Sequence, residues 1–277
     1  MIALRLDRIR KRFIAPDGGA ISAIDDLSVD IAGGSFVVIV GPNASGKSTF
    51  LNLVAGRERP DIGTITAKLD GYEQDWTNTC ATDRSQYIAR VHQDPTAGTA
   101  DDLTVIEHLR LVQLPRAATP FGAAVATEFH RSTKLRLGNT TLATKLGAMV
   151  SELSYGQRQL LALEMAAARS AKILLLDEPT ASLDRANTAF CMRRVEELRN
   201  ELRATVLLVT HDMAVAAQFG ERLLVLRDGK LRSDLSGAEK APLKAADIFH
   251  LCGFDAPALV KTPDGLDHTQ AGVVGGG

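Results

Sequence analysis

The chain has 277 residues, of which 45% are apolar and 23% are charged, a balance typical of a folded globular protein. Its 32 lysine and arginine residues almost equal its 33 acidic residues, and the formal charge of −1 disfavours a dedicated nucleic-acid binder, although a local basic patch remains compatible with it. The apolar runs are strand-sized, so no segment predicts a membrane-spanning helix or a signal peptide. The three cysteines form no metal-binding spacing, and we expect reduced structural thiols.

The N-terminal part of the chain predicts strands grouped around one helix. Residues 2–31 alternate apolar and polar side chains, which predicts two strands joined by a turn at Pro16-Asp17-Gly18-Gly19. The apolar run 37–40 predicts a buried strand, which leads through a glycine-bearing loop into a helix over 48–55. A further strand pair is expected at 63–71 and 88–92. The order of strand, loop and helix indicates an α/β sheet.

The middle of the chain predicts a helix at 103–114 and a second helix at 121–135, the latter because that segment is rich in alanine and poor in β-branched residues. The later expected elements are a helix at 157–169, a strand at 173–176, a helix at 185–202, a strand at 206–209 and a strand pair around Asp228-Gly229. We therefore expect one domain over 1–236, with an α/β core at 1–99 and 153–236, a helical insertion at 100–152, a helical segment at 237–254 and a flexible tail at 255–277.

The loop between the predicted strand 37–40 and the predicted helix 48–55 fits the pattern GxxxxGK[ST]. Backbone N–H groups of such a loop and of the following helix N-terminus converge on one point and bind polyphosphate. Lys47 can reach the β- and γ-phosphates, and Ser48 can offer its hydroxyl to Mg²⁺. A glycine-rich turn without a ligand is the disfavoured alternative. The residues expected to contact the nucleotide are Gly41, Asn43, Ala44, Ser45, Gly46, Lys47, Ser48 and Thr49.

Two acidic residues, Asp177 and Glu178, end the apolar strand expected at 173–176. Alone, such a pair is as compatible with solvated carboxylates at a strand end as with a catalytic site. Beside a phosphate-binding loop, one acid can reach the bound metal and its neighbour can deprotonate water. We assign Asp177 to Mg²⁺, through water, and Glu178 to the attacking water as general base.

Several ordered motifs resemble those of the ABC-type ATPases. The segment Leu153-Ser154-Tyr155-Gly156-Gln157 is similar to the LSGGQ signature of that family and lies some twenty residues before the two acids, where the family has it. The resemblance covers about residues 2–235. The other matching positions are Phe13 (adenine stacking), Gln93 (glutamine loop), 182–184 ending in Asp184 (D-loop) and His211 (switch histidine).

The resemblance implies an ABC-type P-loop NTPase fold with an N-terminal antiparallel β subdomain and a helical signature subdomain. It implies two ATP molecules held between two copies arranged head to tail. Ser154 and Gly156, with Gln157 beside them, would then contact the γ-phosphate held by Lys47 of the other copy, aided by the helix dipole. Gln93 would help to coordinate Mg²⁺ and His211 would hold the γ-phosphate and position the water. Asp184 would contact the opposite copy.

Two positions depart from the family pattern. Ala44 replaces the commoner glycine of the phosphate loop, and Tyr155 replaces the first glycine of the signature. Both substitutions are compatible with activity because the phosphate-facing residues remain. Tyr155 nonetheless adds bulk at the expected dimer interface. It is either a tolerated substitution or a residue that slows closure or makes closure depend on a partner.

A single cassette without membrane spans resembles the separate ATP-binding subunit of a multi-subunit transporter, located at the cytoplasmic face of the inner membrane through its permease. The segments 92–109 and 237–240 resemble the subunits of tryptophan/tyrosine-type importers, which receive substrate from an extracytoplasmic binding protein. We therefore expect an importer of amino acids or similar small solutes, with no nucleic-acid partner. An exporter, a lipoprotein-release system or, less favoured, a soluble ABC ATPase remain the alternatives.

Overall fold

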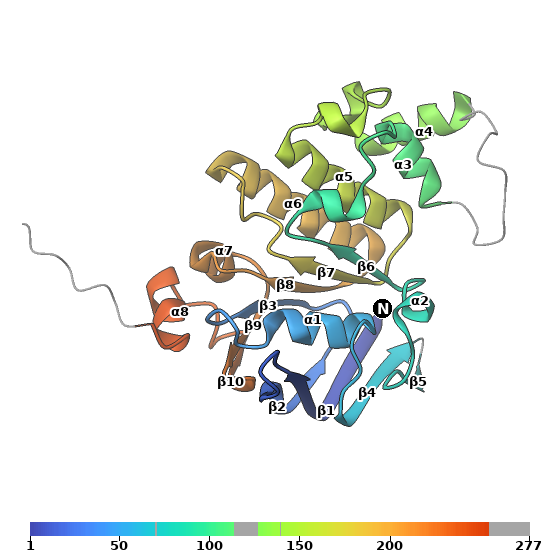
Figure 1. Cartoon of the computed structure of the whole chain (residues 1–277). Coiled ribbons are helices and arrows are strands. Elements are labelled where there is room, and N and C mark those ends of the chain that lie inside the picture. Colours follow the sequence, from blue (N-terminus) through green and yellow to red (C-terminus); the bar gives the residue numbers. More distant parts are fainter. Residues whose placement is uncertain (70, 114–126, 139, 255–277) are drawn as a thin grey trace, which may run out of the picture.

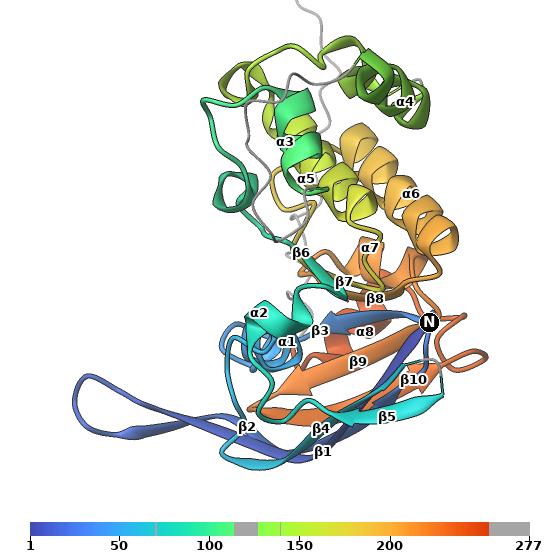
Figure 2. The same ribbon diagram turned by 90° about the vertical axis from the view of Figure 1, so that its right-hand side faces the viewer.

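Two sheets and a helical part form the molecule, seen in the computed structural model of Figure 1, which describes residues 1–69, 71–113, 127–138 and 140–254. The first sheet is antiparallel. Its strands, in spatial order, are β2 (Ala20–Ile31), β1 (Ile2–Ile14), β4 (Ile62–Leu69) and β5 (Tyr72–Asp75). The pairing of β1 with β2 and with β4 is antiparallel, and the two long strands β1 and β2 project as a hairpin beyond the rest of the molecule (Figure 2).

The second sheet has six strands and is parallel except at one edge, where β10 runs antiparallel to β9. Its strands, in spatial order, are β10 (Lys230–Ser236), β9 (Arg222–Arg227), β3 (Phe36–Val40), β8 (Thr205–Val209), β7 (Ile173–Asp177) and β6 (Ile88–Val91). The three central strands, β3, β8 and β7, are almost wholly apolar and buried, as expected for strands covered on both faces.

The helices fall into those beside the sheets and those of the helical part. Beside the sheets lie α1 (Lys47–Ala55), α2 (Ala81–Arg84), α6 (Arg185–Leu202), α7 (Met213–Gln218) and α8 (Ala245–Leu251). The helical part contains α3 (Val105–Leu111), α4 (Thr127–Leu137), α5 (Tyr155–Ala168) and the 3₁₀ turns η1 (Pro95–Gly98), η2 (Thr141–Thr144) and η3 (Val150–Glu152). No helix within the described ranges is long and apolar enough to cross a bilayer.

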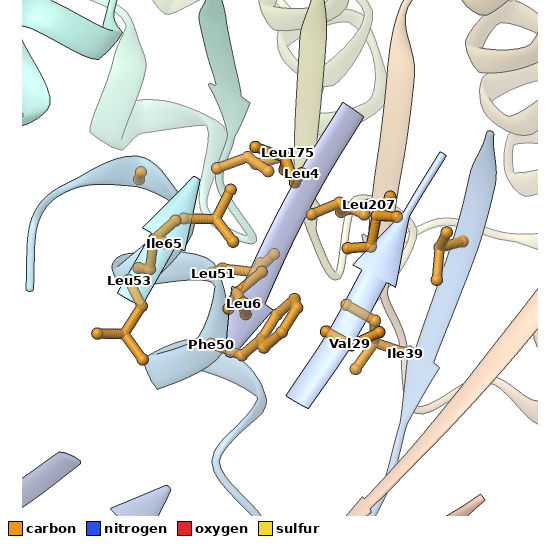
Figure 3. Packing of buried hydrophobic residues seen from close by; sticks show 14 of the residues in the cluster. Leu4, Leu6, Val29, Ile39, Phe50, Leu51, Leu53, Ile65, Leu175 and Leu207 are labelled. Carbon is orange, nitrogen blue, oxygen red and sulfur yellow. The ribbon is translucent and has the colours of Figure 1, made fainter. Parts of the chain in front are cut away.

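Three apolar clusters hold these layers together. The first fills the space between the two sheets around α1, with Phe50 and Leu51 of that helix next to Leu6 of β1 (Figure 3) and with Leu207 of β8 in the same cluster. The second covers the opposite face of the parallel sheet with α5, α6, α7 and α8. The third lies inside the helical part between α3, η2 and α5. Because apolar burial is the main stabilising term in folding, α1 is fixed firmly between its two sheets.

All three cysteines are free thiols, as expected. Cys191 on α6 and Cys252 after α8 are buried, and burial raises the pKa of Cys191 to about 12 and raises that of Cys252 as well. Cys80, just before α2, is half-buried, and its thiol donates to Asp83 Oδ2 over 3.2 Å.

Several expected elements are found where the sequence places them, including the helix over 185–202. One prediction is wrong: the segments near 63–71 and 88–92 do not pair. Strand β4 instead pairs with β1 and β5, while β6 pairs with β7 in the other sheet. The short, exposed β5 is separated from the end of β4 by only two residues, and this local hairpin was the missed alternative.

Boundaries in the helical part also differ from expectation. The helix expected from 103 begins at Val105, because Thr104 caps it with a reciprocal capping box to Glu107. The helix expected over 121–135 corresponds to α4, which runs from Thr127; residues 121–126 and the expected tail at 255–277 lie outside the described residues. The expected helical segment 237–254 contains the single helix α8.

Candidate nucleotide-binding site

The carboxyl ends of four neighbouring strands define the candidate site. Strands β3, β8, β7 and β6 lie side by side and parallel, so their carboxyl ends meet at one edge of the sheet. The phosphate loop follows β3, and His211 is the second residue after β8. Asp177 ends β7 with Glu178 next to it, and Gln93 lies just beyond β6. Ligands bind at this edge in open α/β sheets.

Two glycines allow the phosphate loop to pass close to other backbone. Gly41 has φ of 152° and Gly46 has φ of 102°. A Cβ at Gly41 would lie 2.0 Å from the carbonyl oxygen of Leu226, and one at Gly46 would lie 2.4 Å from that of Ala23. Both positions therefore require glycine. Ala44 adopts a left-handed backbone with φ of 61°, the conformation that the commoner glycine would take without steric cost.

Lys47, the first residue of α1, has its side chain folded against the loop. Its Nζ donates to the carbonyl oxygens of Gly41 and Pro42 over 2.9 and 2.8 Å. Burial lowers the pKa of the ammonium, and the carboxylates of Glu178 and Asp177 act in the opposite direction. A cation is thus held inside a loop of backbone groups, facing the acids at the end of β7.

The remaining loop side chains line the mouth of this cradle. Ser45 Oγ is buried and has no hydrogen-bond partner among the described residues. Such an orphaned hydroxyl, next to two positions that exclude a Cβ, fits a polar ligand such as phosphate. Asn43 and Ala44 of the loop and Ser48 in the first turn of α1 are exposed, while Thr49 of α1 is half-buried.

Asp177 is paired with an arginine that the motif pattern does not indicate. Arg90, in the middle of β6, places Nη2 2.6 Å from Asp177 Oδ2 and Nη1 2.5 Å from Asn52 Oδ1. Asn52 belongs to α1, so one guanidinium joins the helix of the phosphate loop to the strand of the acids. The detectable sequence signal is a charged residue inside the otherwise apolar strand 88–91.

Glu178 and His211 contact each other directly. His211 Nε2 lies 2.6 Å from Glu178 Oε1, and the backbone N–H of Glu178 donates to Val209 at the end of β8. Glu178 has φ of 51°, an uncommon conformation for a residue with a Cβ. Uncommon backbone conformations cluster at functional sites. The structure thus brings the expected base and the expected switch histidine together.

Gln93 is exposed just beyond β6, and its backbone oxygen accepts a hydrogen bond from the hydroxyl of Tyr155. The preceding residue, His92, is half-buried, with its Nε2 3.4 Å from Arg57 Nη2. Burial lowers the pKa of His92, and the charges of Arg90 and Arg57 lower it further.

The signature segment begins helix α5. Ser154 is the N-cap, and it exchanges hydrogen bonds with Gln157: Gln157 N donates to Ser154 Oγ over 3.3 Å, and Ser154 N donates to Gln157 Oε1 over 3.1 Å. Gly156 faces Leu183, whose Cδ2 would be 3.4 Å from a Cβ at that position. The signature residues therefore lie together with the start of α6, on elements other than the strand ends that hold Lys47 and Glu178.

Two expected residues lie at the periphery. Asp184 caps α6, its carboxylate accepting from the backbone N–H and the side-chain amide of Asn187 over 2.8 and 2.9 Å, and these bonds lower its pKa. Phe13 lies on β1 opposite Ile21 with 37% of its surface exposed, and Lys11 Nζ is 5.3 Å from its ring centroid. Ala23, on β2 like Ile21, places its carbonyl oxygen where a Cβ on Gly46 would lie only 2.4 Å away, so this hairpin passes close to the phosphate loop.

The donor set fits nucleotide phosphates better than a metal held by protein alone. Within the described part of the chain, no group of three or more histidine, cysteine or acidic side chains is arranged to hold a metal. A divalent ion at this edge would thus depend on oxygens of a phosphate ligand, which is the usual way that Mg²⁺ is bound beside nucleotides.

A model of the ABC transporter family matches residues 24–181, more than half of the chain. The chain belongs to the ABC transporter ATP-binding family. A second model, described as an AAA domain of a putative AbiEii toxin from a type IV toxin–antitoxin system, matches residues 147–217, the part of this ABC cassette from the signature to the switch histidine.

Curated relatives of this ABC cassette are ATP-binding proteins of transport systems. A tyrosine transport ATP-binding protein of Clostridioides difficile is 35% identical over 89% of this chain and 97% of its own length. A sulfate/thiosulfate import ATP-binding protein of Chromobacterium violaceum is 32% identical over 99% of this chain and 72% of its own. An arabinose import ATP-binding protein of Burkholderia cenocepacia is 30% identical, and the match spans only 53% of that protein. The narrower resemblance expected from the sequence is confirmed by the tyrosine transport relative.

Solved ABC cassettes share the fold. A dimeric ATP-binding cassette in a post-hydrolysis state, bound to ADP and Pi, superposes with a TM-score of 0.68 at 28% identity, over 84% of this chain and 98% of that chain. A cassette of another ABC transporter superposes with a TM-score of 0.74 at 24% identity, over 91% of this chain and 98% of that chain, and shows the fold alone. The expected fold class and the family of ATP-hydrolysing transport ATPases are confirmed.

Proposed function

We propose that the chain is the ATP-hydrolysing subunit of a multi-subunit importer of amino acids or similar small organic solutes. The observation that carries this proposal is the meeting of Lys47, Asp177, Glu178 and His211 at the carboxyl edge of one parallel sheet. The arabinose and sulfate/thiosulfate import relatives support import, and the tyrosine transport relative supports an amino-acid cargo. Residues 1–236 would form one ATPase domain, with 100–152 as its helical insertion.

In this proposal the phosphate loop and Lys47 bind the polyphosphate, and Phe13 stacks on adenine. Glu178 accepts a proton from the attacking water, and His211, in contact with Glu178, keeps that carboxylate oriented. Mg²⁺, when bound, supplies charge neutralisation of the phosphates; Ser48, Gln93 and Asp177 would hold it, Asp177 through water. Arg90 fixes the orientation of Asp177.

We further propose a head-to-tail dimer in which two ATP molecules are shared. Ser154, Gly156 and Gln157 would contact the nucleotide bound by the other copy, and Asp184 would contact the opposite copy. The capping box orients Ser154 at the start of α5, where the helix dipole favours an anion. The dimeric form of a related cassette supports this arrangement.

The contact with an integral membrane permease would lie at a cavity of about 450 Å³ between the sheets and the helical part. Residues that line it include Arg57, Arg90, His92, Ala97, Val112 and Arg169. A permease segment seated there would touch the residues that lead into Gln93, so its position would reach the nucleotide site. The chain would thereby be peripheral at the cytoplasmic face of the cell membrane, and an extracytoplasmic binding protein would deliver the solute.

The test is to purify the tagged chain from its own membranes in mild detergent and to identify co-purifying proteins by mass spectrometry. A polytopic permease together with a solute-binding protein is the expected result, and the ligand of that binding protein would identify the cargo. A permease alone would favour an exporter or a lipoprotein-release system. Soluble partners alone would contradict the transporter proposal and leave a soluble ABC ATPase.

A further inference from the structure

Tyr155 lies at the position where the signature pattern of the family has its first glycine. It is the first residue of α5, directly after the N-cap Ser154, and its side chain is half-buried. The hydroxyl has a hydrogen-bond partner within its own chain. It donates a hydrogen bond to the backbone oxygen of Gln93, which is 62 residues away in the sequence. A glycine at position 155 has no group that could make this bond.

Two neighbouring side chains of α5 strengthen the same connection. Gln159, fully buried, places its Nε2 3.4 Å from the carbonyl oxygen of His92. Arg158 Nη1 lies 2.7 Å from Asp101 Oδ1, and its Nη2 donates to the carbonyl oxygen of Ser151 over 3.2 Å. The first two turns of α5 thus bond to both ends of the segment 92–101, at residues 92 and 93 and at residue 101. Tyr155 supplies the one of these links that reaches residue 93 itself.

The two connected segments face different nucleotides under the proposed function. Gln93 follows β6 and lies at the edge that holds the chain's own phosphate loop. Ser154 and Gly156 flank Tyr155 in sequence and would contact the nucleotide of the other copy. A displacement of Gln93 at the chain's own nucleotide site would therefore also displace Ser154 and Gly156, which would contact the nucleotide of the other copy.

We propose that the Tyr155 hydroxyl is a positioning group that couples the two ATP sites of the dimer through the backbone of Gln93. The inference rests on the proposed head-to-tail dimer and adds a role for a residue outside its ATP contacts. Closure around the first ATP moves Gln93, and the hydrogen bond carries that movement to Ser154 and Gly156. The signature segment that contacts the second ATP is then already in its binding position, so the second ATP binds more tightly than the first. This is positive cooperativity.

The test compares Tyr155→Phe, which removes only the hydroxyl, with the wild-type chain. ATPase rates are measured against ATP concentration. We expect the wild type to have a Hill coefficient between one and two, the ceiling for two sites, and Tyr155→Phe to fall to about one with a maximal rate changed less than tenfold. Tyr155→Gly should behave like Tyr155→Phe. The matched control is Tyr72→Phe, because Tyr72 is 78% exposed on β5; it should leave the Hill coefficient unchanged.

Amide hydrogen exchange measured without nucleotide tests the hydrogen bond from Tyr155 to Gln93 independently of the ATP-dependent dimer. In Tyr155→Phe the amides of residues 92–101 should exchange about fivefold faster, the effect of losing one hydrogen bond. Unchanged exchange in that segment, a wild-type Hill coefficient of one, or an unchanged Hill coefficient in Tyr155→Phe would each overturn the coupling. Absence of an ATP-dependent dimer in a Glu178→Gln chain would instead overturn the proposed function, whatever the exchange result.

Discussion

Arg90 and Asp177 form an ion pair of 2.6 Å between neighbouring parallel strands, with 11% and 17% of their side chains exposed. The same guanidinium lies 2.5 Å from Asn52 on α1. The acid assigned to the metal is thus oriented by a residue that also contacts the helix of the phosphate loop. Arg90 belongs to β6, the strand that leads into Gln93. One guanidinium therefore connects β6, the acid that ends β7 and the helix that follows the phosphate loop.

Replacing Arg90 with Met should lower the free energy of unfolding by roughly 3 kcal/mol, because it leaves the Asp177 carboxylate largely buried without its partner. Urea denaturation of the purified chain measures this. Arg90→Lys should recover part of the loss, since it retains the charge without the forked geometry. Arg59→Met is the control, because Arg59 is exposed. An Arg90→Met chain as stable as the control would show that the pair contributes nothing.

Glu178→Gln should abolish ATP turnover, with a loss of at least about a hundredfold, because an amide cannot accept the proton of the attacking water. ATP binding should persist, and the variant should form a stable dimer when ATP is added. Steady-state hydrolysis, nucleotide titration and size-exclusion chromatography measure the three effects. Hydrolysis retained near the wild-type rate would falsify the assignment of Glu178 as base.

Lys47→Ala should weaken ATP binding about tenfold or more, since it removes the cation held at the carbonyl oxygens of Gly41 and Pro42. Equilibrium titration with a fluorescent ATP analogue provides the measurement. Lys68→Ala, at an exposed position of β4, is the charge-matched control and should bind normally. If Lys47→Ala bound ATP as tightly as this control, the phosphate-loop assignment would have to be abandoned.

The lowered pKa of His92 makes stability depend on pH. Burial comes first among its causes, followed by the charges of Arg90 and Arg57, while Asp177 acts in the opposite direction. In the unfolded chain the imidazole has its ordinary pKa near 6.5, so below that pH the unfolded state binds more protons than the folded state. The stabilisation from neutral His92 is present above pH 6.5. It is lost as the pH falls below 6.5 and through the lower pKa that His92 has in the folded chain.

A His92→Asn chain should therefore lose less stability than the wild type between pH 7.5 and pH 5.5, the range on either side of the unfolded pKa. Urea midpoints at the two pH values measure the difference. His130→Asn is the control, because His130 is exposed on α4. Equal losses in the wild type and in His92→Asn would contradict the assigned cause.

Local patterns predict the core of the site well, because its residues follow strands in a fixed manner. The apolar run before Gly41 and the one before Asp177 both require burial, and parallel strands bring their carboxyl ends to one edge. The contact of Glu178 with His211 follows from that geometry, since β7 and β8 are neighbours. His211 itself was expected from the resemblance to the ABC-type ATPases, and the structure places it beside the acid that follows β7.

Contacts between distant segments were beyond local patterns. The sequence near Arg90 reveals a charge in a strand but not the carboxylate that neutralises it, because the partner depends on the spatial order of the strands. For Tyr155, the sequence predicts bulk at the expected dimer interface but does not reveal the hydrogen bond that its hydroxyl donates to the backbone oxygen of Gln93. The pairing of β4 with β5 was missed for a different, local reason, since the four residues of β5 are all exposed and show no apolar alternation that would predict a strand.

The three thiols differ in burial, so a thiol-reactive dye can label the chain at one cysteine. Cys191 and Cys252 are enclosed by apolar side chains and stay protonated, and alkylating reagents attack the thiolate. Cys80, half-buried before α2, is the thiol that a maleimide dye would reach first in the native state. One fluorophore could therefore be attached to the wild-type chain without removing any cysteine, and binding or assembly could be followed by its anisotropy.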